Sequence, residues 1–396
     1  DVRATAINEA MKMAAVKALA DLTRQPVPEQ VNIAYGETRL TFGKEYIIPK
    51  PFDQRLIYEI PPAVAKAAME SGVAKAPIED WDKYREELML RSGNDNKVVR
   101  QLYGRARSNA KKIVFAEADH LDVLKAAQIV HEEGIAIPIL LGRKDIILEL
   151  KKELEFDADL AIIDPMSEEF DERHVRYATK YWESRKRSGV TFYSAKIKMR
   201  ERNYFGSMMV LEGDADGMIS GYSRAYPTVV KPILEVIGRA NGVKKVATVN
   251  IMITDRGPLF LADTSINIEP NAEELADIAQ MTANVASNFG FDPVLAMLSY
   301  ANFGSSTHPN ARKVREAVRI LHETAPDLVV DGEIQTDFAL NRELHESKFP
   351  FSKLAGRKVN TLIFPNLEPA NITYKLLKEL NSADSIGPIM VGLRKA

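Results

Sequence analysis

The residues best suited to bind a ligand lie in the segment that starts at Tyr204, YFGSMMVLEGDADGMISGYSRAYPTVVKP. Residues 217–220 read as a short apolar strand that ends at Gly221, and residues 222–226 form a loop before a helix that begins near Pro227. Backbone N–H groups at a helix start have no partner inside the helix, and the helix dipole favours negative charge there. This segment can therefore hold a phosphate or a carboxylate. The alternative is an ordinary turn between a strand and a helix.

Several side chains near strand ends could contact such a ligand. In the first loop these are Ser220, Tyr222, Ser223 and Arg224, and in the later segment NFGSSTHP they are Asn302 and Ser305. Another polar cluster follows the apolar run at 328–330 and consists of Asp331, Glu333, Gln335 and Asp337. Its carboxylates fit a metal or acid–base pair, but we expect helix capping and interdomain hydrogen bonds instead. His308 has no second histidine at metal-ligand spacing, so we expect a loop histidine near a helix start.

Composition limits the class of protein. The 396 residues suggest two or three domains, and 45% hydrophobic with 27% charged residues is typical of a globular protein. A net charge of −2 gives no electrostatic reason to expect nucleic acid or a membrane surface as a partner. The chain has no cysteine, which excludes disulfides and thiolate chemistry and fits the cytoplasm. No apolar run approaches the roughly 20 residues of a membrane span. The first residue is Asp1 and not methionine, so we expect a fragment of a longer protein.

From Lys112 onward, strand-length apolar runs alternate with helical patterns, which predicts an α/β fold with mostly parallel sheets covered on both faces. The predicted strands are 113–116, 137–141, 160–163, 217–220, 246–253, 294–298, 328–330, 361–364 and 388–391. Asn271 and Glu274 form a predicted capping box at the start of one helix. Another helix places Val314, Ala317, Val318 and Leu321 on one stripe.

The N-terminal region is predicted to be mainly helical. We expect helices over 8–24, from Ala63 to Ser71 and over 79–90, with an irregular proline-rich stretch before Ala63 because Pro61 and Pro62 disfavour a regular element. The polar run RSGNDN at 91–96 predicts a linker.

Residues 112–396 resemble the phosphate acetyltransferase (phosphotransacetylase) family. The blocks that carry the resemblance include KIVFAEADHLDVLKAAQIVHEEGIAIPILLG, RKRSGVT, VLAMLSYANFGS, APDLVVDGEIQTDFAL and NTLIFPNLEPANITYK. Residues 1–90 resemble the end of the malic domain of large bacterial malic enzymes, through DVRATAINEAMKMAAVKAL, FGKEYIIPKPFD and PAVAKAAMESGVA. Together they resemble the C-terminal part of hybrid NADP-dependent malic enzymes.

The resemblance implies a domain organisation. Two three-layer αβα domains with a cleft between them, like those of isocitrate and isopropylmalate dehydrogenases, would follow the helical segment. The implied boundaries are 1–90 for the end of the malic domain, 91–111 for a linker, 112–242 plus 388–396 for the first phosphotransacetylase-like domain and 243–387 for the second. Family members bind CoA and acetyl-CoA in the cleft and usually dimerise through the second domain.

The resemblance also implies ligand contacts. Arg185 matches a CoA-contacting arginine, although it could equally neutralise a helix C-terminus before Gly189. Lys231 stands where the family has a second arginine, and Arg224 where it usually has a histidine. Three positions depart from the family pattern: Glu379 replaces an arginine, Asn366 an aspartate and Ala370 a glycine. The family's Ser-Arg pair and aspartate base follow the position of Ala396 and so lie outside this sequence.

We therefore expect a regulatory domain of an NADP-dependent malic enzyme. This domain would bind acetyl-CoA or CoA and would have no acetyltransferase activity of its own. NADP and Mg²⁺ or Mn²⁺ would be bound only by the parent malic domain, and we expect no catalytic residue and no metal in this part. We expect a cytoplasmic homodimer or higher homo-oligomer, with helices near 271–289 and 310–323 at the interface. Two alternatives stay open: an active phosphate acetyltransferase cut short at its C-terminus, and a purely structural oligomerisation module.

Overall fold

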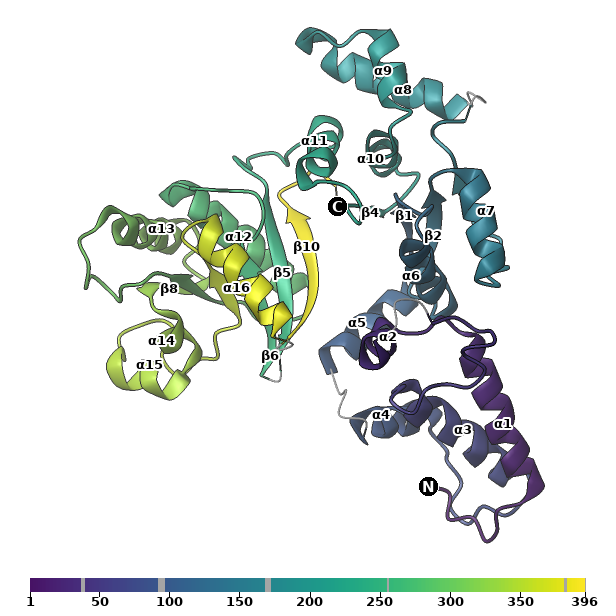
Figure 1. Ribbon diagram of the computed structural model, residues 1–396. Helices are drawn as coiled ribbons and strands as arrows, with labels where there is room; N and C mark the ends of the chain where they lie inside the picture. The colour runs from purple at the N-terminus through teal and green to yellow at the C-terminus, as the bar shows by residue number, and fades with distance from the viewer. Residues whose placement is uncertain (37–39, 92–96, 168–171, 255, 381–382, 396) are drawn as a thin grey trace. The chain divides into compact units, whose positions relative to one another are not determined.

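The computed structural model describes residues 1–36, 40–91, 97–167, 172–254, 256–380 and 383–395. The chain forms two compact units, which are described separately (Figure 1). Unit 1 comprises Asp1–Arg100, Asp119–Glu133 and Asp145–Asp159, and unit 2 comprises Gln101–Ala118, Gly134–Lys144 and Leu160–Ala396. Among the described residues, no helix has the length and apolar character needed to cross a membrane.

Unit 1 is built from helices. They are α1 (Glu9–Arg24), α2 (Glu29–Tyr35), α3 (Arg55–Glu70), α4 (Trp81–Arg91), α6 (Leu121–Glu132) and most of α7 (Lys144–Glu153). The side chain of Asn8 caps α1 by accepting a hydrogen bond from the backbone N–H of Met11 at 3.0 Å. Helices α1 and α3 pack against each other, and Met11, Ala65, Ala68 and Leu88 lie in one buried cluster.

The prediction of an irregular stretch before Ala63 is wrong. Helix α3 begins at Arg55 and continues through Pro61 and Pro62. Each of these prolines lacks an N–H group, so the helix loses two internal hydrogen bonds there. Pro62 is buried and belongs to the packed face that includes Ala65 and Ala68, so tertiary packing outweighs the local preference.

The expected linker at 91–111 contains α5 (Lys97–Ser108), and β1 begins at Lys111. Most of the RSGNDN run, residues 92–96, lies outside the described part of the chain.

The first sheet of unit 2 has four parallel strands in the order β3-β2-β1-β4. The strands are β1 (Lys111–Phe115), β2 (Ala136–Leu141), β3 (Ile162–Ile163) and β4 (Gly217–Ile219). The helices that follow β3 and β4 are α8 (Glu172–Arg185), the 3₁₀ turn η1 (Lys186–Ser188), α9 (Phe192–Lys198), α10 (Arg202–Glu212) and α11 (Tyr226–Val236). Val114 and Leu141 of the strands share a buried cluster with Tyr181 of α8 and with Phe205 and Met208 of α10.

The second sheet has six strands in the order β10-β5-β6-β9-β7-β8. The strands are β5 (Ala247–Thr254), β6 (Gly257–Ala262), β7 (Val294–Leu298), β8 (Val329–Ile334), β9 (Thr361–Ile363) and β10 (Asp384–Val391). The helices are α12 (Ala272–Asn288), α13 (Pro309–Thr324), α14 (Thr336–Leu340), α15 (Arg342–Lys348) and α16 (Leu367–Glu379). Strand β5 is antiparallel to both neighbours, and the other three pairings are parallel.

Helices cover both faces of this second sheet (Figure 1). Neighbouring residues of a strand point to opposite faces. Leu261 of β6 packs in a cluster with Ala339 of α14 and Ala370 of α16, whereas Phe260 contacts Phe289 at the end of α12. The predicted α/β class is confirmed, and the sheet is the middle of three layers.

Three details refine the predicted elements. The capping box of α12 is present, with Glu274 N donating to Asn271 Oδ1 at 2.9 Å and Asn271 N donating to Glu274 Oε2 at 3.0 Å. Strand β6 was not among the predicted strands, and it lies between β5 and β9 in the sheet. The expected domain boundary between residues 387 and 388 coincides with a register shift in β10, which pairs with β5 through Asp384–Ile386 and again through Ile389–Val391.

Candidate ligand-binding site

The loop after β4 closes around a carboxylate of the protein itself. Glu117, two residues after β1, is 1% exposed. Its Oε1 accepts hydrogen bonds from the N–H groups of Gly221 at 2.7 Å and Tyr222 at 2.9 Å. Its Oε2 accepts from Ser223 N at 2.9 Å and from the Ser223 hydroxyl. Gly221 adopts φ of 104°, a conformation that side-chain-bearing residues rarely take, and this turns the three N–H groups toward one point.

This arrangement holds Glu117 in its charged form. Burial alone would raise the pKa of Glu117, but the hydrogen bonds from Ser223, Gly221 and Tyr222 lower it below its ordinary value. The sequence left two readings of this loop open, a site for an external phosphate or carboxylate and an ordinary turn between a strand and a helix. In the structure the N–H groups of residues 221–223 bind the internal carboxylate of Glu117.

The hydroxyl of Ser220 also has an internal partner, since it donates to Asn203 Oδ1 at 2.6 Å. The side chain of Tyr222 is 59% exposed. Thus, of the four predicted loop residues, Ser220 and Ser223 position the loop in this structure, and Tyr222 and Arg224 lie at the surface.

Arg224 lines a cavity of about 270 Å³ together with three other arginines. They are Arg143 after β2, and Arg200 and Arg202 at the turn between α9 and α10. The carboxylates on the same wall are bonded to backbone N–H groups: Asp164 accepts from Met166 at 2.9 Å, and Glu201 caps α10 through Asn203 and Tyr204, both at 3.2 Å. The cavity lining does not include Arg185 or Lys231, with which the sequence grouped Arg224.

Arg185 is the last residue of α8, and a 3₁₀ turn leads from it to Gly189, whose φ is 83°. A cation at this position interacts favourably with the negative end of the helix dipole, which is one of the two roles that the sequence suggested for Arg185. The guanidinium also has a second neighbour, because its Nη2 lies 3.8 Å from Glu235 Oε1 on α11. Its Nε is buried and has no hydrogen-bond partner among the described residues.

Glu235 is the centre of a hydrogen-bond network that the sequence did not reveal. Its Oε2 accepts from Lys198 Nζ at 2.8 Å, from the Tyr181 hydroxyl at 2.8 Å and from the Tyr204 hydroxyl at 2.6 Å. Lys198 Nζ also donates to both tyrosine hydroxyls at 3.0 Å. Burial alone would raise the pKa of Glu235, but the bonds from Lys198 and the tyrosines lower it to about 2. The residues come from α8, α9, α10 and α11, so no local pattern in the sequence links them.

Lys231 joins this region through its position on α11. It is exposed and stands four residues before Glu235, and residues four apart lie on the same face of a helix. The structure therefore places Lys231 one helical turn from the carboxylate that contacts Arg185. Lys231 and Glu235 thus share one face of α11, and Arg185 contacts Glu235 from the end of α8.

Comparison with known proteins identifies the family. Residues 97–396 match the model of the family described as phosphate acetyl/butaryl transferase. The chain belongs to this family. The phosphate acetyltransferase of Thermoanaerobacterium thermosaccharolyticum is 42% identical to it over 304 residues, which cover 75% of this chain and 91% of the relative. The chain is also similar over its whole length to larger proteins. The NADP-dependent malic enzyme of Escherichia coli K12 is 41% identical over 401 residues, which cover 100% of this chain and 52% of the relative. The chain thus spans about half the length of the malic enzymes that it matches.

Solved structures agree with this membership. A phosphotransacetylase from Streptococcus pyogenes has a TM-score of 0.67 at 38% identity and covers 75% of this chain and 91% of its own. The EutD phosphotransacetylase from Staphylococcus aureus has a TM-score of 0.69 at 32% identity and covers 76% and 91%.

In this transferase-family chain, the other two predicted ligand residues belong to the second sheet. Asn302 Nδ2 donates to Gln335 Oε1 at 2.8 Å, and Gln335 N donates to Asn302 Oδ1 at the same distance. Ser305 Oγ accepts from Asn302 N at 3.0 Å. These bonds shape the loop after β7, and none of the contacts between described residues joins it to Arg185 or Lys231.

The polar cluster after β8 also has structural roles. Glu333 is fully buried and accepts a bidentate pair of bonds from Arg315, at 2.6 and 3.1 Å, together with Gly304 N at 2.8 Å. Burial alone would raise the pKa of Glu333, but these bonds lower it. Asp331 Oδ2 accepts from Ser352 Oγ and Lys353 N, both at 2.9 Å. All of these partners lie around the second sheet. These contacts are therefore not the interdomain hydrogen bonds that the sequence led us to expect.

His308 caps α13, with its Nδ1 accepting from Asn310 N at 3.3 Å. Within the described part of the chain, no group of three His, Asp or Glu side chains could hold a metal ion.

Proposed function

We propose that this chain is the part of an NADP-dependent malic enzyme that binds a CoA ester and regulates the parent enzyme. One observation carries the proposal. The malic enzymes align with the whole chain, including residues 1–96, which the transferase family model does not match. The phosphate acetyltransferase of Thermoanaerobacterium thermosaccharolyticum aligns with only 75% of the chain. Oxidative decarboxylation of malate, with NADP and Mg²⁺ or Mn²⁺, is then the activity of the parent.

Binding of a CoA ester is supported by Arg185 and Lys231. CoA carries several phosphates, and a guanidinium or an ammonium group binds phosphate through charge-assisted hydrogen bonds. Arg185 is about one-third exposed, and Lys231 is exposed on α11. The Glu235 carboxylate accepts a hydrogen bond from Lys198 at 2.8 Å, whereas it lies 3.8 Å from the Arg185 guanidinium.

In our proposal this part of the malic enzyme does not transfer acetyl groups. Resemblance to the family places Glu379 where transferases carry an arginine, and Glu379 is exposed at the end of α16. A reversed charge there would repel the phosphate that an acetyltransferase must bind. An active phosphate acetyltransferase, which would convert acetyl-CoA and phosphate to acetyl phosphate and CoA, is the second candidate, favoured by the 42% identity with a phosphate acetyltransferase.

Calorimetric titration with acetyl-CoA tests the binding proposal. We expect saturable binding, and we expect Arg185→Ala and Lys231→Ala each to weaken it about tenfold, because a charge-assisted hydrogen bond contributes about 1.5–3 kcal/mol. Lys180→Ala is the matched control, since Lys180 is also on α8 and pairs with Glu212 at 2.9 Å. No binding, or unchanged affinity in both variants, would reject the assignment. Acetyl phosphate formation in a coupled assay would favour the transferase.

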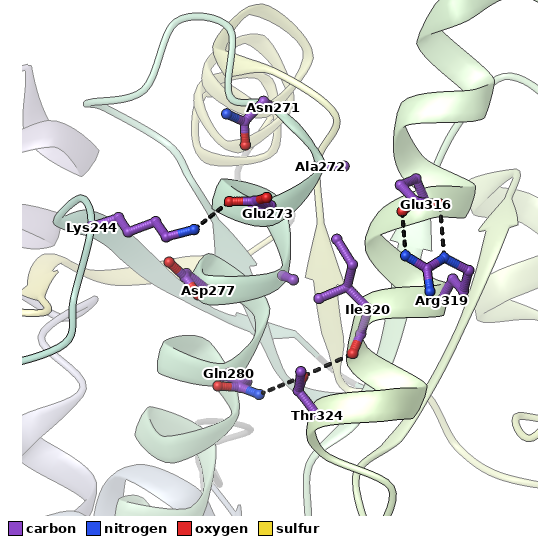
Figure 2. A pocket seen from close by; sticks show the side chains of 11 residues that line it. Lys244, Asn271, Ala272, Glu273, Asp277, Gln280, Glu316, Arg319, Ile320 and Thr324 are labelled. Carbon is purple, nitrogen blue, oxygen red and sulfur yellow. Dashed lines mark hydrogen bonds and ion pairs between the residues drawn. The ribbon is translucent and has the colours of Figure 1, made fainter.

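We also propose that the domain self-associates through the groove between α12 and α13. This groove has a volume of about 740 Å³ and opens between the two helices. Figure 2 shows its polar walls, where Lys244 pairs with Glu273 and Arg319 pairs with Glu316, and it shows Ile320 among them. Both signs of charge occur on one face, so a second copy related by a two-fold axis can supply opposite charges to each side.

Asp277 also lines this groove. Burial and the neighbouring Glu273 and Glu274 raise the pKa of Asp277, although Lys244 opposes them. A positive charge that a second copy brings to the groove would favour the charged form of this carboxyl.

A further inference from the structure

The positive charges around Arg185 outnumber the carboxylates that pair with them. Two cations, Arg185 and Lys198, stand on either side of one carboxylate, Glu235. The carboxylate is shared unequally. Lys198 Nζ is 2.8 Å from Oε2, within hydrogen-bond range, whereas Arg185 Nη2 is 3.8 Å from Oε1 and beyond it. One positive charge is therefore left over, and the geometry assigns it to Arg185.

We propose that Lys198 and Glu235 set the charge that Arg185 offers to an anionic ligand, because Lys198 holds the Glu235 carboxylate away from the guanidinium. This inference rests on the proposed function, in which Arg185 contacts a phosphate of the CoA ester. Lys198 and Glu235 are positioning residues in this scheme.

The tyrosines explain why the carboxylate stays with Lys198. The hydroxyls of Tyr181 and Tyr204 donate to Glu235 Oε2 and accept from Lys198 Nζ, so each one bridges the two charged groups. All three donors of Glu235 converge on Oε2, and Oε1 is left facing Arg185. The pKa of Lys198 would be lowered by burial, but its bonds to Glu235 and the tyrosines raise it instead, so the ammonium group stays charged.

Two substitutions should then act in opposite directions. Glu235→Gln removes the only carboxylate near Arg185 among the described contacts, and the affinity for acetyl-CoA should increase about fivefold, the effect of one charge about 4 Å away when water screens it fully. Lys198→Met frees Glu235 to pair with Arg185, and the affinity should fall about fivefold. In the double variant no carboxylate remains for Lys198 to hold away from Arg185, so the affinity should stay above the wild-type value and within about twofold of that of Glu235→Gln.

The experiment is acetyl-CoA titration by calorimetry on these three variants, with thermal unfolding followed in parallel. Glu212→Gln and Lys180→Met are matched controls, because Lys180 and Glu212 form a pair of the same kind at 2.9 Å between α8 and α10. Neither control should change the affinity. Lys198→Arg keeps the positive charge and should bind nearly as well as the wild type. If Glu235→Gln proves too unstable to titrate, Lys198→Met and Lys198→Arg still test the inference.

The outcomes separate this inference from the proposed function. A loss of binding in the double variant equal to that in Lys198→Met would show that Lys198 touches the ligand itself, and it would overturn the inference. If Glu235→Gln binds acetyl-CoA with unchanged affinity while Arg185→Ala loses binding, the inference is also overturned. The proposed function is then left intact. If Arg185→Ala binds normally, the proposed function fails first.

Discussion

Ser223 N donates a hydrogen bond to Oε2 of Glu117 at 2.9 Å, across 106 positions of the sequence. Together with the Ser223 hydroxyl and the N–H groups of Gly221 and Tyr222, it gives the buried carboxylate four donors. Glu117 follows β1 and Ser223 follows β4, and these strands are adjacent and parallel. Glu117 therefore fixes the loop that leads into α11, and α11 carries Lys231 and Glu235.

We expect Glu117→Ala to destabilise the protein by about 2–4 kcal/mol. The substitution leaves three backbone donors and a hydroxyl without their acceptor, and unsatisfied buried donors cost free energy of this order. Chemical denaturation of both proteins measures the difference. Glu149→Ala, at an exposed position of α7, is the control and should change the free energy of unfolding by less than about 0.5 kcal/mol. A change of the same small size for Glu117→Ala would contradict the role of this carboxylate.

The sequence predicted the regular elements well, because most of their signals are local. All nine predicted strands overlap strands of the structure. The buried stripe of α13 contains all four predicted residues, Val314, Ala317, Val318 and Leu321, and also Ala311. The helix that passes through Pro61 and the strand β6 were missed, since in both cases tertiary contacts outweigh a local preference.

The candidate site was harder to predict for the same reason. The local sequence indicates that N–H groups near Gly221 are available to an anion, but it does not show that Glu117 supplies the carboxylate. Tyr181, Lys198 and Glu235 come from three helices, and only the packing of those helices brings them together. The positions of backbone hydrogen-bond donors can be predicted from the local sequence, whereas the acceptor that they bind depends on the fold.

Glu235 should make stability depend on pH in the acidic range. Its pKa is lowered from 4.5 to about 2 in the folded protein. A carboxyl with a lowered folded pKa contributes stability that is present above about pH 4.5 and is lost as the pH falls toward 2. A shift of this size corresponds to about 3 kcal/mol. We therefore expect the difference in unfolding free energy between the wild type and Glu235→Gln to shrink as the pH falls from 5 toward 2.5. Denaturation curves across this range measure it, and a constant difference would argue against an ionised Glu235 in the network.

Self-association through α12 and α13 predicts the effect of a charge in the groove. We expect the wild-type chain to sediment as a dimer at micromolar concentration, and we expect Ile320→Glu to sediment as a monomer, because it places a carboxylate among Glu316, Glu273 and Asp277. Ile372→Glu is the control, since Ile372 is 64% exposed on α16, which covers the other face of the same sheet. A monomeric wild type would reject the proposal, and dissociation by Ile372→Glu alone would move the interface to α16.

The chain as given should not oxidise malate by itself. Malate oxidation by a malic enzyme needs a bound divalent metal ion and a nicotinamide cofactor. Residues 1–90 contain no GxGxxG turn for a dinucleotide, and the described residues include no group of three acidic or histidine side chains that could hold a metal ion. We expect no NADPH to form from malate, NADP⁺ and Mg²⁺ or Mn²⁺, as followed by absorbance, while a full-length malic enzyme assayed alongside should form it. Acetyl-CoA should then change the rate of a full-length protein that contains this chain, and Arg185→Ala in that protein should weaken the effect. An absorbance rise from the chain alone that survives repurification would show that it carries its own metal and cofactor sites.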